Sequence, residues 1–295
     1  MNKPLTPIIV LFFVGFILGS CAADRPAPQA SPFQARTYSD SPANPDGKLG
    51  MLAGGPESIR RAVRSKDNYA LQRRFPNIVV LRGSSASRRL ALTFDDGPDS
   101  RFTPQLLDIL KKHGVKATFF VMGARVDGHP AIARRMHEEG HVLGNHTYWH
   151  PRLWVESFDR IRWEANETDK AIEKITGYSP KLFRPPYGGL DDELVTELGK
   201  MNYSVVGWSV DSYDWKQLDS AAVQGNVLDQ LHPGAIILMH SAGDWTQDLT
   251  GMVQAVDALI PRLKEEGYEF VTVPELLGLP IRKPSASDYA DETAR

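Results

Sequence analysis

The chain has 295 residues, with 34 Lys and Arg against 36 Asp and Glu, so its formal net charge is −2. This balance argues against nucleic acid as the main partner, because nucleic-acid binding favours a basic face. The hydrophobic fraction of 42% and the charged fraction of 24% are those of an ordinary globular protein, neither disordered nor fibrous. A single cysteine, Cys21, excludes an intramolecular disulfide and any cysteine-based zinc or iron–sulfur site, so a metal would be held by His and carboxylate side chains.

The amino terminus has the pattern of a secretory signal. Lys3 precedes an apolar run, Ile8–Leu18, that is shorter than the ~20 residues a membrane-spanning helix needs. Residues 18–21 read Leu-Gly-Ser-Cys, which resembles a bacterial lipobox and implies cleavage before Cys21 and lipidation of its thiol. We therefore expect residues 1–20 to be a lipoprotein-type signal peptide, with the rest of the chain tethered to the membrane on its extracytoplasmic side. A plain signal peptide, with a secreted product, or a signal anchor is the alternative.

Residues 21–76 have the composition of a linker followed by a weakly structured region. Five prolines lie among Ala, Ser, Asp and Gln before residue 50, and no apolar period is visible. Such a segment is extended where it is rich in proline and flexible elsewhere. Residues 50–75 are only weakly helix-like, and the pattern places no element there. At the other end, the polar residues 283–295 are expected to form a flexible tail.

Residues 77–282 alternate short apolar runs with amphipathic helical stretches. Several runs are apolar at consecutive positions, which indicates strands buried on both faces, as in a parallel sheet. This rhythm predicts an α/β domain, either a TIM-like barrel or a doubly wound sheet. The predicted strands are Leu90–Phe94, Ala117–Met122, His141–Gly144, Leu182–Arg184, Tyr203–Val210, Ala235–Met239 and Phe270–Val273.

The helices between these strands have readable ends. Thr103 is expected to cap the first helix, with Pro104 at its first position and Gly114 as its stop. Gly140 and Gly177 are expected to end the next two helices in the same way.

Polar side chains that can carry chemistry follow five of the predicted strands. In parallel α/β folds, functional groups gather at the carboxyl ends of strands. Taken singly, each group has an ordinary explanation, such as a turn for the Asp-Asp-Gly-Pro segment or a hydrogen-bonded core histidine for His240. Their joint placement predicts a functional rim. The groups are Asp95 and Asp96, His146 and His150, Arg184, Asp211 with Asp214 and Trp215, and His240.

Five segments, in order, resemble the motifs of the NodB-type polysaccharide deacetylases, carbohydrate esterase family four. The resemblance implies a distorted (β/α) barrel with about seven strands, in agreement with the rhythm above. It also implies a metal-dependent deacetylase. The matching segments are Thr93-Phe94-Asp95-Asp96, His146-Thr147-Tyr148-Trp149-His150, Arg184-Pro185-Pro186-Tyr187, Asp211-Ser212-Tyr213-Asp214-Trp215 and Leu238-Met239-His240.

The resemblance assigns Asp96, His146 and His150 as ligands of one divalent metal ion. Two His and one carboxylate form a facial triad that leaves coordination positions open. Zinc is the first choice, and cobalt or manganese suits the same donors. An open site of this kind can acidify a water molecule and polarise the carbonyl of an N-acetyl group.

The resemblance also implies an acid–base pair. Asp95 is the expected general base, oriented by Arg184. His240 is the expected general acid, and Asp214 beside it would favour the imidazolium and raise the pKa of His240. The backbone N–H of Tyr187 is the expected oxyanion donor.

Three further features of the motifs concern substrate binding. Leu238 and Trp215 are expected to line a small apolar pocket for the acetyl methyl group. Tyr148 and Trp149 lie between the two ligand histidines and either stack on a sugar or simply pack. Asp211 is a contact without an assigned role.

The expected function is hydrolysis of N-acetyl groups on an N-acetylglucosamine-containing glycan. Tethering at a cell surface makes peptidoglycan the first expected substrate, ahead of chitin oligosaccharides and of O-acetyl esters such as those of xylan. No nucleic acid is expected as a partner, and a monomer is expected. The rival hypothesis is a surface glycan-binding protein that keeps the fold without turnover. Because Asp95, Arg184, Asp214 and His240 are all present, the sequence favours an enzyme.

Overall fold

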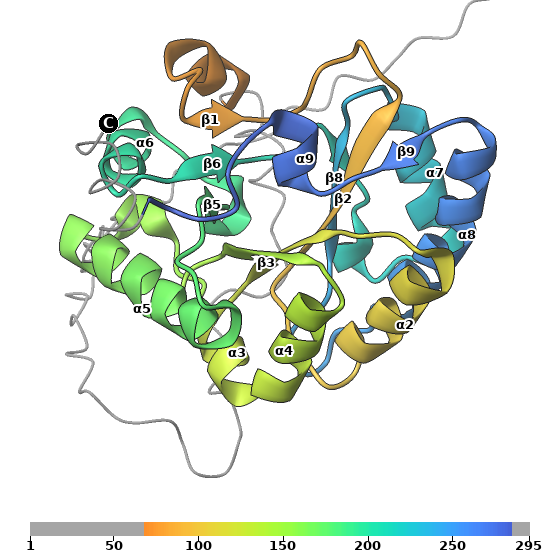
Figure 1. Cartoon of the computed structure of the whole chain (residues 1–295), viewed down its shortest axis with the longest axis horizontal. Coiled ribbons are helices and arrows are strands. Elements are labelled where there is room, and N and C mark those ends of the chain that lie inside the picture. The colour runs from red at the N-terminus through yellow and green to blue at the C-terminus, as the bar shows by residue number, and fades with distance from the viewer. Residues whose placement is uncertain (1–67, 285–295) are drawn as a thin grey trace, which may run out of the picture. The chain divides into compact units, whose positions relative to one another are not determined.

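The computed structural model describes residues 68–284 (Figure 1). The predicted signal peptide, Cys21 and the greater part of the predicted linker and tail lie outside the described residues. Within residues 68–284, no helix combines the length and the apolar character needed to cross a bilayer. Residues 68–74 are helical and Leu71 is buried, so the packed part of the chain begins ahead of the predicted domain boundary at residue 77.

The strands of residues 68–284 form one parallel sheet in the order β1-β6-β5-β4-β3-β2-β8-β7, with β9 also paired to β2. Each strand except β1 falls on or beside a predicted apolar run. The strands are β1 (Val79–Val80), β2 (Arg89–Asp95), β3 (Thr118–Val121), β4 (Val142–Asn145), β5 (Leu182–Phe183), β6 (Ser204–Val206), β7 (Val210–Asp211), β8 (Ile236–His240) and β9 (Glu269–Phe270).

The segment of β6 and β7 joins β5 to β8 and so closes the sheet into a distorted barrel, which confirms the barrel and excludes the doubly wound alternative. The run Tyr203–Val210 was predicted as one strand, but the structure divides it into β6 and β7. The segment pairs with β5 through β6 and with β8 through β7, so it turns from one neighbour to the other. At the turn, the N–H of Gly207 donates to Val80 and that of Ser209 donates to Ile236.

Alternate residues of each strand face the barrel interior. Along β8, Ile236 belongs to an interior cluster with Phe120 and Val206, whereas Ile237 and Met239 pack outward against helices. Because side chains alternate along a strand, Leu238 and His240 share the inward face with Ile236. The same parity on β2 turns Thr93 and Asp95 inward, so the polar residues of the site follow the apolar ones along the barrel interior.

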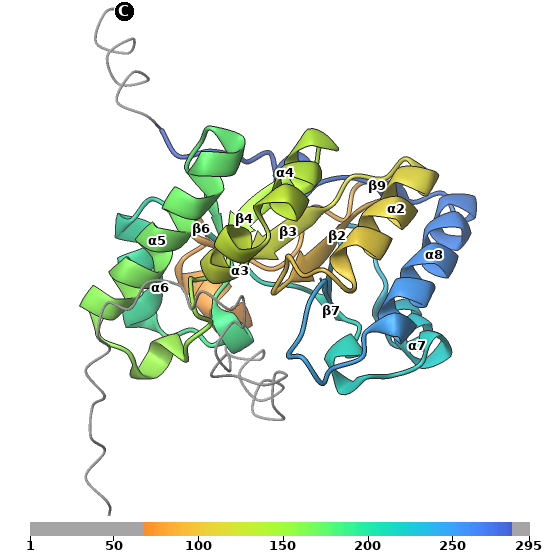
Figure 2. The ribbon, with the colours of Figure 1, turned by 90° about the horizontal axis from the view of Figure 1, so that it is seen from below.

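Helices cover the outer face of the barrel on both sides (Figure 2). Helices α2, α7 and α8 lie together on one side over the largest apolar cluster, and α5 and α6 lie on the other side over a second cluster, with α5 contributing to both. Burying each large apolar side chain contributes about 1.5–3 kcal/mol. The helices are α2 (Thr103–His113), α3 (Gly123–Gly128), α4 (Pro130–Glu138), α5 (Phe158–Thr176), α6 (Asp192–Lys200), α7 (Ser220–Gln230), α8 (Thr250–Glu265) and α9 (Val273–Leu277).

Two local predictions at element ends are wrong. Thr103 is the first helical residue and not a cap. Its hydroxyl donates to the carbonyl of Ser241 at 2.9 Å, which ties α2 to the end of β8. The predicted strand Phe270–Val273 ends early because Thr272 caps α9, and Glu275 completes a capping box that turns the chain into a helix. The stops at Gly114 and Gly177 are confirmed, since both residues take left-handed backbone angles.

Candidate active site

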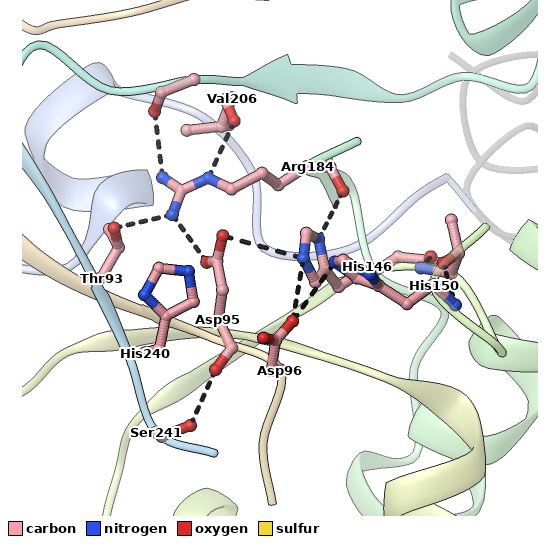
Figure 3. A network of polar contacts seen from close by, with 12 residues as sticks. Thr93, Asp95, Asp96, His146, His150, Arg184, Val206, His240 and Ser241 are labelled. Atoms are coloured by element: carbon pink, nitrogen blue, oxygen red, sulfur yellow. Dashed lines mark hydrogen bonds and ion pairs between the residues drawn. The ribbon is translucent and has the colours of Figure 1, made fainter. Parts of the chain in front are cut away.

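Asp96, His146 and His150 meet at the carboxyl ends of β2 and β4 (Figure 3). Oδ1 of Asp96 lies 3.4 Å from Nε2 of each histidine. These three atoms are buried, and none has a hydrogen-bond partner among the described residues. Their ligand atoms lie within 4.8 Å of one another. Three potential metal-ligand atoms that converge at this spacing and lack hydrogen-bond partners fit a divalent cation.

The charges of the three groups suit a cation. Burial lowers the pKa of His150 to about 3, with Asp96 opposing this effect, so the imidazole is neutral. Burial alone would raise the pKa of Asp96, but His150 and His146 hold the pKa of this carboxyl far below its usual range. An ionised carboxylate beside a neutral imidazole is the state that binds metal.

Backbone geometry separates the two adjacent carboxylates. Asp95 is the last residue of β2, whereas Asp96 takes a φ of 70°, in the left-handed region that non-glycine residues rarely adopt. The change of direction turns Asp96 toward the histidines and leaves Asp95 on the inward face. His150 is also left-handed, with a φ of 58°. Such angles cost about 1–3 kcal/mol each and persist only where the surroundings enforce them.

His146 is held in one tautomer. Its Nδ1 lies 2.7 Å from the backbone carbonyl of Arg184, which can only accept, so Nδ1 carries the proton. Nε2 is therefore left with its lone pair facing Asp96. A carbonyl behind a ligand histidine orients the ring and raises its basicity.

The segment between the ligand histidines is anchored by Glu164, a buried residue of α5. Its Oε2 accepts the backbone N–H groups of Tyr148 at 2.7 Å and of Trp149 at 2.8 Å. The Tyr148 hydroxyl donates to Asp127, and its ring edge packs so closely on Gly123 that a Cβ there would overlap it. Packing therefore explains the position of Tyr148. A sugar-stacking role for Trp149 stays a prediction.

Asp95 and Arg184 form an ion pair of 2.7 Å inside the barrel. Three further N–H groups of the guanidinium also donate hydrogen bonds. They reach Thr93 Oγ1 and the carbonyls of Val206 and Gly207, at the break between β6 and β7. The second carboxylate oxygen, Oδ2, is buried without a hydrogen-bond partner and lies 3.8 Å from Nε2 of His146. Asp95 thus points one oxygen at Arg184 and the other at the triad.

His240, the last residue of β8, pairs with Asp214. The ring Nδ1 and the backbone N–H of His240 each lie 2.7 Å from a carboxylate oxygen of Asp214. Burial alone would lower the pKa of His240, but Asp214, with Asp96 and Asp95 further away, raises it to about 9. The expected direction of this shift agrees with the structure.

Tyr187 lies in a short 3₁₀ turn, η2 (Pro186–Gly188), with a φ of 61°. Its ring contacts that of His150 edge to face, with centroids 4.6 Å apart. The turn is held from outside the motifs, because Asn68 donates from Nδ2 to the carbonyl of Gly188 at 3.0 Å. The expected oxyanion role of the Tyr187 N–H stays a prediction.

Leu238 and Trp215 lie beside the His240–Asp214 pair. Leu238 is fully buried on the inward face of β8, opposite Thr93. Trp215 follows Asp214 in the turn η3 (Asp214–Lys216) and is half-buried. Their expected acetyl pocket stays a prediction. Asp211, left without a role above, accepts the N–H of Tyr213 and so shapes this turn.

Three residues that position the site were not assigned by sequence reasoning. Thr93 was visible within the first motif, but its bond to Arg184 was not. Glu164 looks like any charged residue of an amphipathic helix, and only its full burial marks it. Asn68 lies in a stretch that the pattern left without structure. Each acts through a contact distant in sequence, which periodicity does not reveal.

A cation-binding triad, a buried carboxylate aimed at it and a His–Asp pair define a metal-dependent hydrolase. The comparisons agree with this class. A family model described as polysaccharide deacetylase matches residues 82–206. A peptidoglycan-N-acetylglucosamine deacetylase of Bacillus cereus is 44% identical over 187 residues, which are 63% of this chain and 67% of that protein.

Further relatives extend the match. The peptidoglycan-N-acetylglucosamine deacetylase PgdA of Listeria monocytogenes is 40% identical over 247 residues, 82% of this chain, and the match spans about half (51%) of that protein. A crystal structure of a peptidoglycan N-acetylglucosamine deacetylase superposes with a TM-score of 0.70 at 39% identity, covering 73% of this chain and 99% of that one. The chain belongs to the polysaccharide deacetylase family and is a metal-dependent hydrolase.

The same fold also exists without turnover. A family pseudoenzyme from Bacillus anthracis superposes with a TM-score of 0.62 at 33% identity, covering 67% of this chain and 68% of that one. A mutant of that pseudoenzyme with restored enzymatic activity superposes equally well. Fold alone therefore does not separate an enzyme from a binding protein, and the site residues must carry that distinction.

Proposed function

We propose that this protein is an extracytoplasmic deacetylase that removes the N-acetyl group from N-acetylglucosamine residues of peptidoglycan. The observation that carries the proposal is the burial of Asp95 and His240 beside one cation-binding triad, each held by its own charged partner. The relatives named as peptidoglycan deacetylases support the choice of polymer.

Asp96, His146 and His150 would hold the divalent ion, and we propose zinc. When bound, such an ion supplies Lewis acidity that polarises the acetyl carbonyl and acidifies a water molecule. Cobalt and manganese can use the same donors, because imidazole and carboxylate ligands bind each of these divalent ions, with manganese the weakest in the usual order of affinity.

Asp95 is the proposed general base. Its Oδ2 faces the triad and has no other described partner, so it can accept the proton of the attacking water. Arg184 holds Oδ1 and fixes the carboxylate plane. A carboxylate with one oxygen tied down keeps the other oxygen at a fixed position, from which it can orient the attacking water toward the amide carbon.

His240 is the proposed general acid. The leaving group of amide hydrolysis is an amine, which departs only after it gains a proton. Nδ1 is committed to Asp214, so the proton is delivered from Nε2. The N–H of Tyr187 is the proposed donor to the developing oxyanion. Leu238 and Trp215 are proposed to enclose the acetyl methyl group.

The glycan-binding alternative makes a different demand on the site. A protein that only binds has no need for both a base and an acid, each tuned by a buried partner. Here Asp95 keeps Arg184 and His240 keeps Asp214. The arrangement therefore favours turnover over binding alone.

We further propose that the mature protein is tethered to the membrane by a lipid on Cys21, on the side where peptidoglycan lies. The lipobox-like segment and the position of the only thiol support this. A secreted form without the lipid is the alternative.

Acetate release tests the proposed function. The metal would be removed with a chelator and restored with zinc, cobalt or manganese, and acetate would be measured on peptidoglycan, N-acetylglucosamine oligomers and acetylated xylan in parallel. Metal-dependent release from peptidoglycan above the other substrates supports the proposal. Release from xylan alone would make the protein an esterase. Metal binding without acetate from any substrate would favour the glycan-binding alternative.

A further inference from the structure

The loop that follows His240, residues 241–249, carries a tryptophan far into solvent. Trp245 is 82% exposed, more than any other large apolar side chain among residues 68–284. A single exposed apolar residue is not informative by itself, since many occur on protein surfaces. The informative feature is how firmly the loop beneath Trp245 is held.

Arg101 holds the backbone of this loop through hydrogen bonds to three of its carbonyl groups. Its Nη1 donates to the carbonyls of Trp245 and Gln247, both at 3.1 Å, and its Nη2 donates to that of Asp244 at 2.8 Å. Its Nε pairs with Asp99 at 3.3 Å, which orients the guanidinium. One side chain thus satisfies three carbonyls around the exposed tryptophan. An ordinary surface loop leaves such groups to water.

A second, buried arginine, Arg125, holds the middle of the same loop. It is almost fully buried, and its Nη2 donates to the carbonyl of Gly243 at 2.6 Å. Its charge interacts with Asp96 of the triad as well as with Asp244 of the loop. The loop therefore lies next to the cation-binding triad.

Both ends of the loop are fastened to residues of the site. At its start, the N–H of Ser241 donates to the carbonyl of Asp95 at 2.9 Å. Near its end, the buried side chain of Gln247 donates to the carbonyl of Trp215 at 2.9 Å. Trp245 is therefore presented from a rigid frame at the rim of the site.

An exposed indole on a firmly held backbone is suited to an apolar face of a sugar ring. Aromatic side chains bind with a large contact area, and a group ordered before binding loses less conformational entropy when a ligand arrives. We propose that Trp245 forms a sugar-binding subsite beyond the reacting residue, stacking on a neighbouring sugar of the glycan strand. This inference rests on the proposed function, and it adds a preference for longer glycans.

The test is the dependence of KM and kcat on oligomer length. The parent and Trp245→Ala are compared on the dimer and the tetramer of N-acetylglucosamine. In the parent, KM is lower for the tetramer than for the dimer. In Trp245→Ala this advantage is lost through a rise of about fivefold or more in the KM for the tetramer, with kcat for the tetramer largely kept. Trp245→Phe, which keeps an aromatic face, retains most of the advantage.

A matched control is Ile281→Ala. Ile281 is 42% exposed, and its carbonyl accepts the N–H of Lys181 just before β5, at the amino ends of the strands. This apolar side chain lies at the end of the barrel opposite the site. The variant is expected to keep the parent's ratio of tetramer to dimer KM.

Direct binding separates this inference from the proposed function. Calorimetric titration of the metal-free protein with both oligomers measures affinity without turnover. A tetramer preference that disappears in Trp245→Ala supports the subsite even if no acetate is released. A preference that survives in Trp245→Ala, or equal losses on dimer and tetramer, would overturn it. Absence of a tetramer preference in the parent would overturn it as well.

Discussion

Arg184 and Asp95 form a 2.7 Å ion pair in which neither side chain is exposed to solvent. The two oxygens of the Asp95 carboxylate face different partners. Oδ1 is committed to the guanidinium, and Oδ2 faces the metal triad. Arg184 also donates to the carbonyls of Val206 and Gly207, so the side chain that orients the proposed base also bridges the break in the barrel wall. One guanidinium therefore holds both the proposed general base and the backbone where β6 gives way to β7.

Replacing Asp95 by Asn should reduce acetate release by about 10²–10⁴-fold, the usual contribution of a general base, while metal content stays at the parent level. The variant should also be less stable, because removing one charge of a buried pair typically costs about 3–5 kcal/mol. Acetate release, metal content and urea unfolding are measured on the same preparation.

The control for Asp95→Asn is Glu197→Gln. Glu197 is mostly buried and pairs with Arg162 on the outside of the barrel, away from the triad. This variant should lose stability and keep activity. If Asp95→Asn were as active as the parent, the assignment of the base would be wrong.

The high pKa of His240 predicts a decline of activity at alkaline pH. An acid must be protonated before it acts, so kcat/KM should fall as pH rises through the pKa of His240, which Asp214 raises to about 9 in the metal-free protein. A bound dication would lower the pKa of His240 and so move this alkaline limb of the kcat/KM profile toward lower pH. The raised pKa of His240 also stabilises the folded state. This stabilisation is fully present at pH values below 6.5, the ordinary pKa of histidine, and it is lost as pH rises through about 9.

Replacing Asp214 by Asn removes the main cause that raises the pKa of His240 and leaves burial to lower it. The alkaline limb of kcat/KM should therefore move to lower pH than in the parent. Asp214→Glu keeps the charge and should hold the limb closer to its original place. A limb that stays unmoved in Asp214→Asn would show that another group titrates there.

Glu164 is expected to control metal affinity without touching the metal. Its carboxylate accepts the N–H groups of Tyr148 and Trp149 between the ligand histidines, so Glu164→Ala frees the segment that spaces them. Loss of such a supporting contact typically lowers metal affinity about 10–100-fold. Competition with a chromogenic chelator measures this. Glu167→Ala, on the same helix but paired with Lys170, should bind zinc like the parent. Equal affinities for both variants would refute the role of Glu164.

The lipobox-like segment predicts that Cys21→Ala moves the protein from the membrane fraction to the soluble extracytoplasmic fraction. The reason is that the thiol is the only one in the chain and the proposed attachment point of the lipid. Labelling with a radioactive fatty acid and fractionation of cells measure both effects. Ser20→Ala, which keeps a small residue before the cysteine, is the control and should stay lipidated. A parent protein that carries no label would end the lipid hypothesis.

The residues at the strand ends could be predicted because motif and topology act together there. Parallel strands place their carboxyl ends at one edge, so Asp96 and His146 converge although they are distant in sequence. Their support could not be read in the same way. The bond from Glu164 to Tyr148 and Trp149 depends on how α5 docks. The left-handed φ of Asp96, His150 and Tyr187 is set by tertiary contacts and not by residue type.

The strand pattern shows the same limit. Periodicity found the buried runs, but it predicts one strand over Tyr203–Val210 because Tyr, Val and Trp dominate that run. The break at Gly207 follows from the closure of the barrel, which requires the segment to change neighbours. Residues 68–74 are helical and bury Leu71, but the sequence around them is only weakly helix-like, so the pattern places no helix there.

Asn68 provides the sharpest test of whether the segment before the motifs serves catalysis. Its Nδ2 donates to the carbonyl of Gly188, next to the left-handed Tyr187. Asn68→Ala leaves that carbonyl unpaired, at a cost of about 1–3 kcal/mol, and releases the turn that presents the Tyr187 N–H. We expect a lower kcat with little change in metal content.

The measurements for Asn68→Ala are kcat, KM, metal content and melting temperature. Asn166→Ala, an exposed asparagine of α5, is the control and should match the parent in all four. If Asn68 has only a structural role, Asn68→Ala lowers the melting temperature and leaves the kcat of the folded fraction unchanged. That result would show that Asn68 does not position the turn that presents the Tyr187 N–H. A fall in kcat measured well below the melting temperature would make residues 68–74 part of the catalytic domain, because the hydrogen bond from Asn68 would then be required to hold the turn at Tyr187.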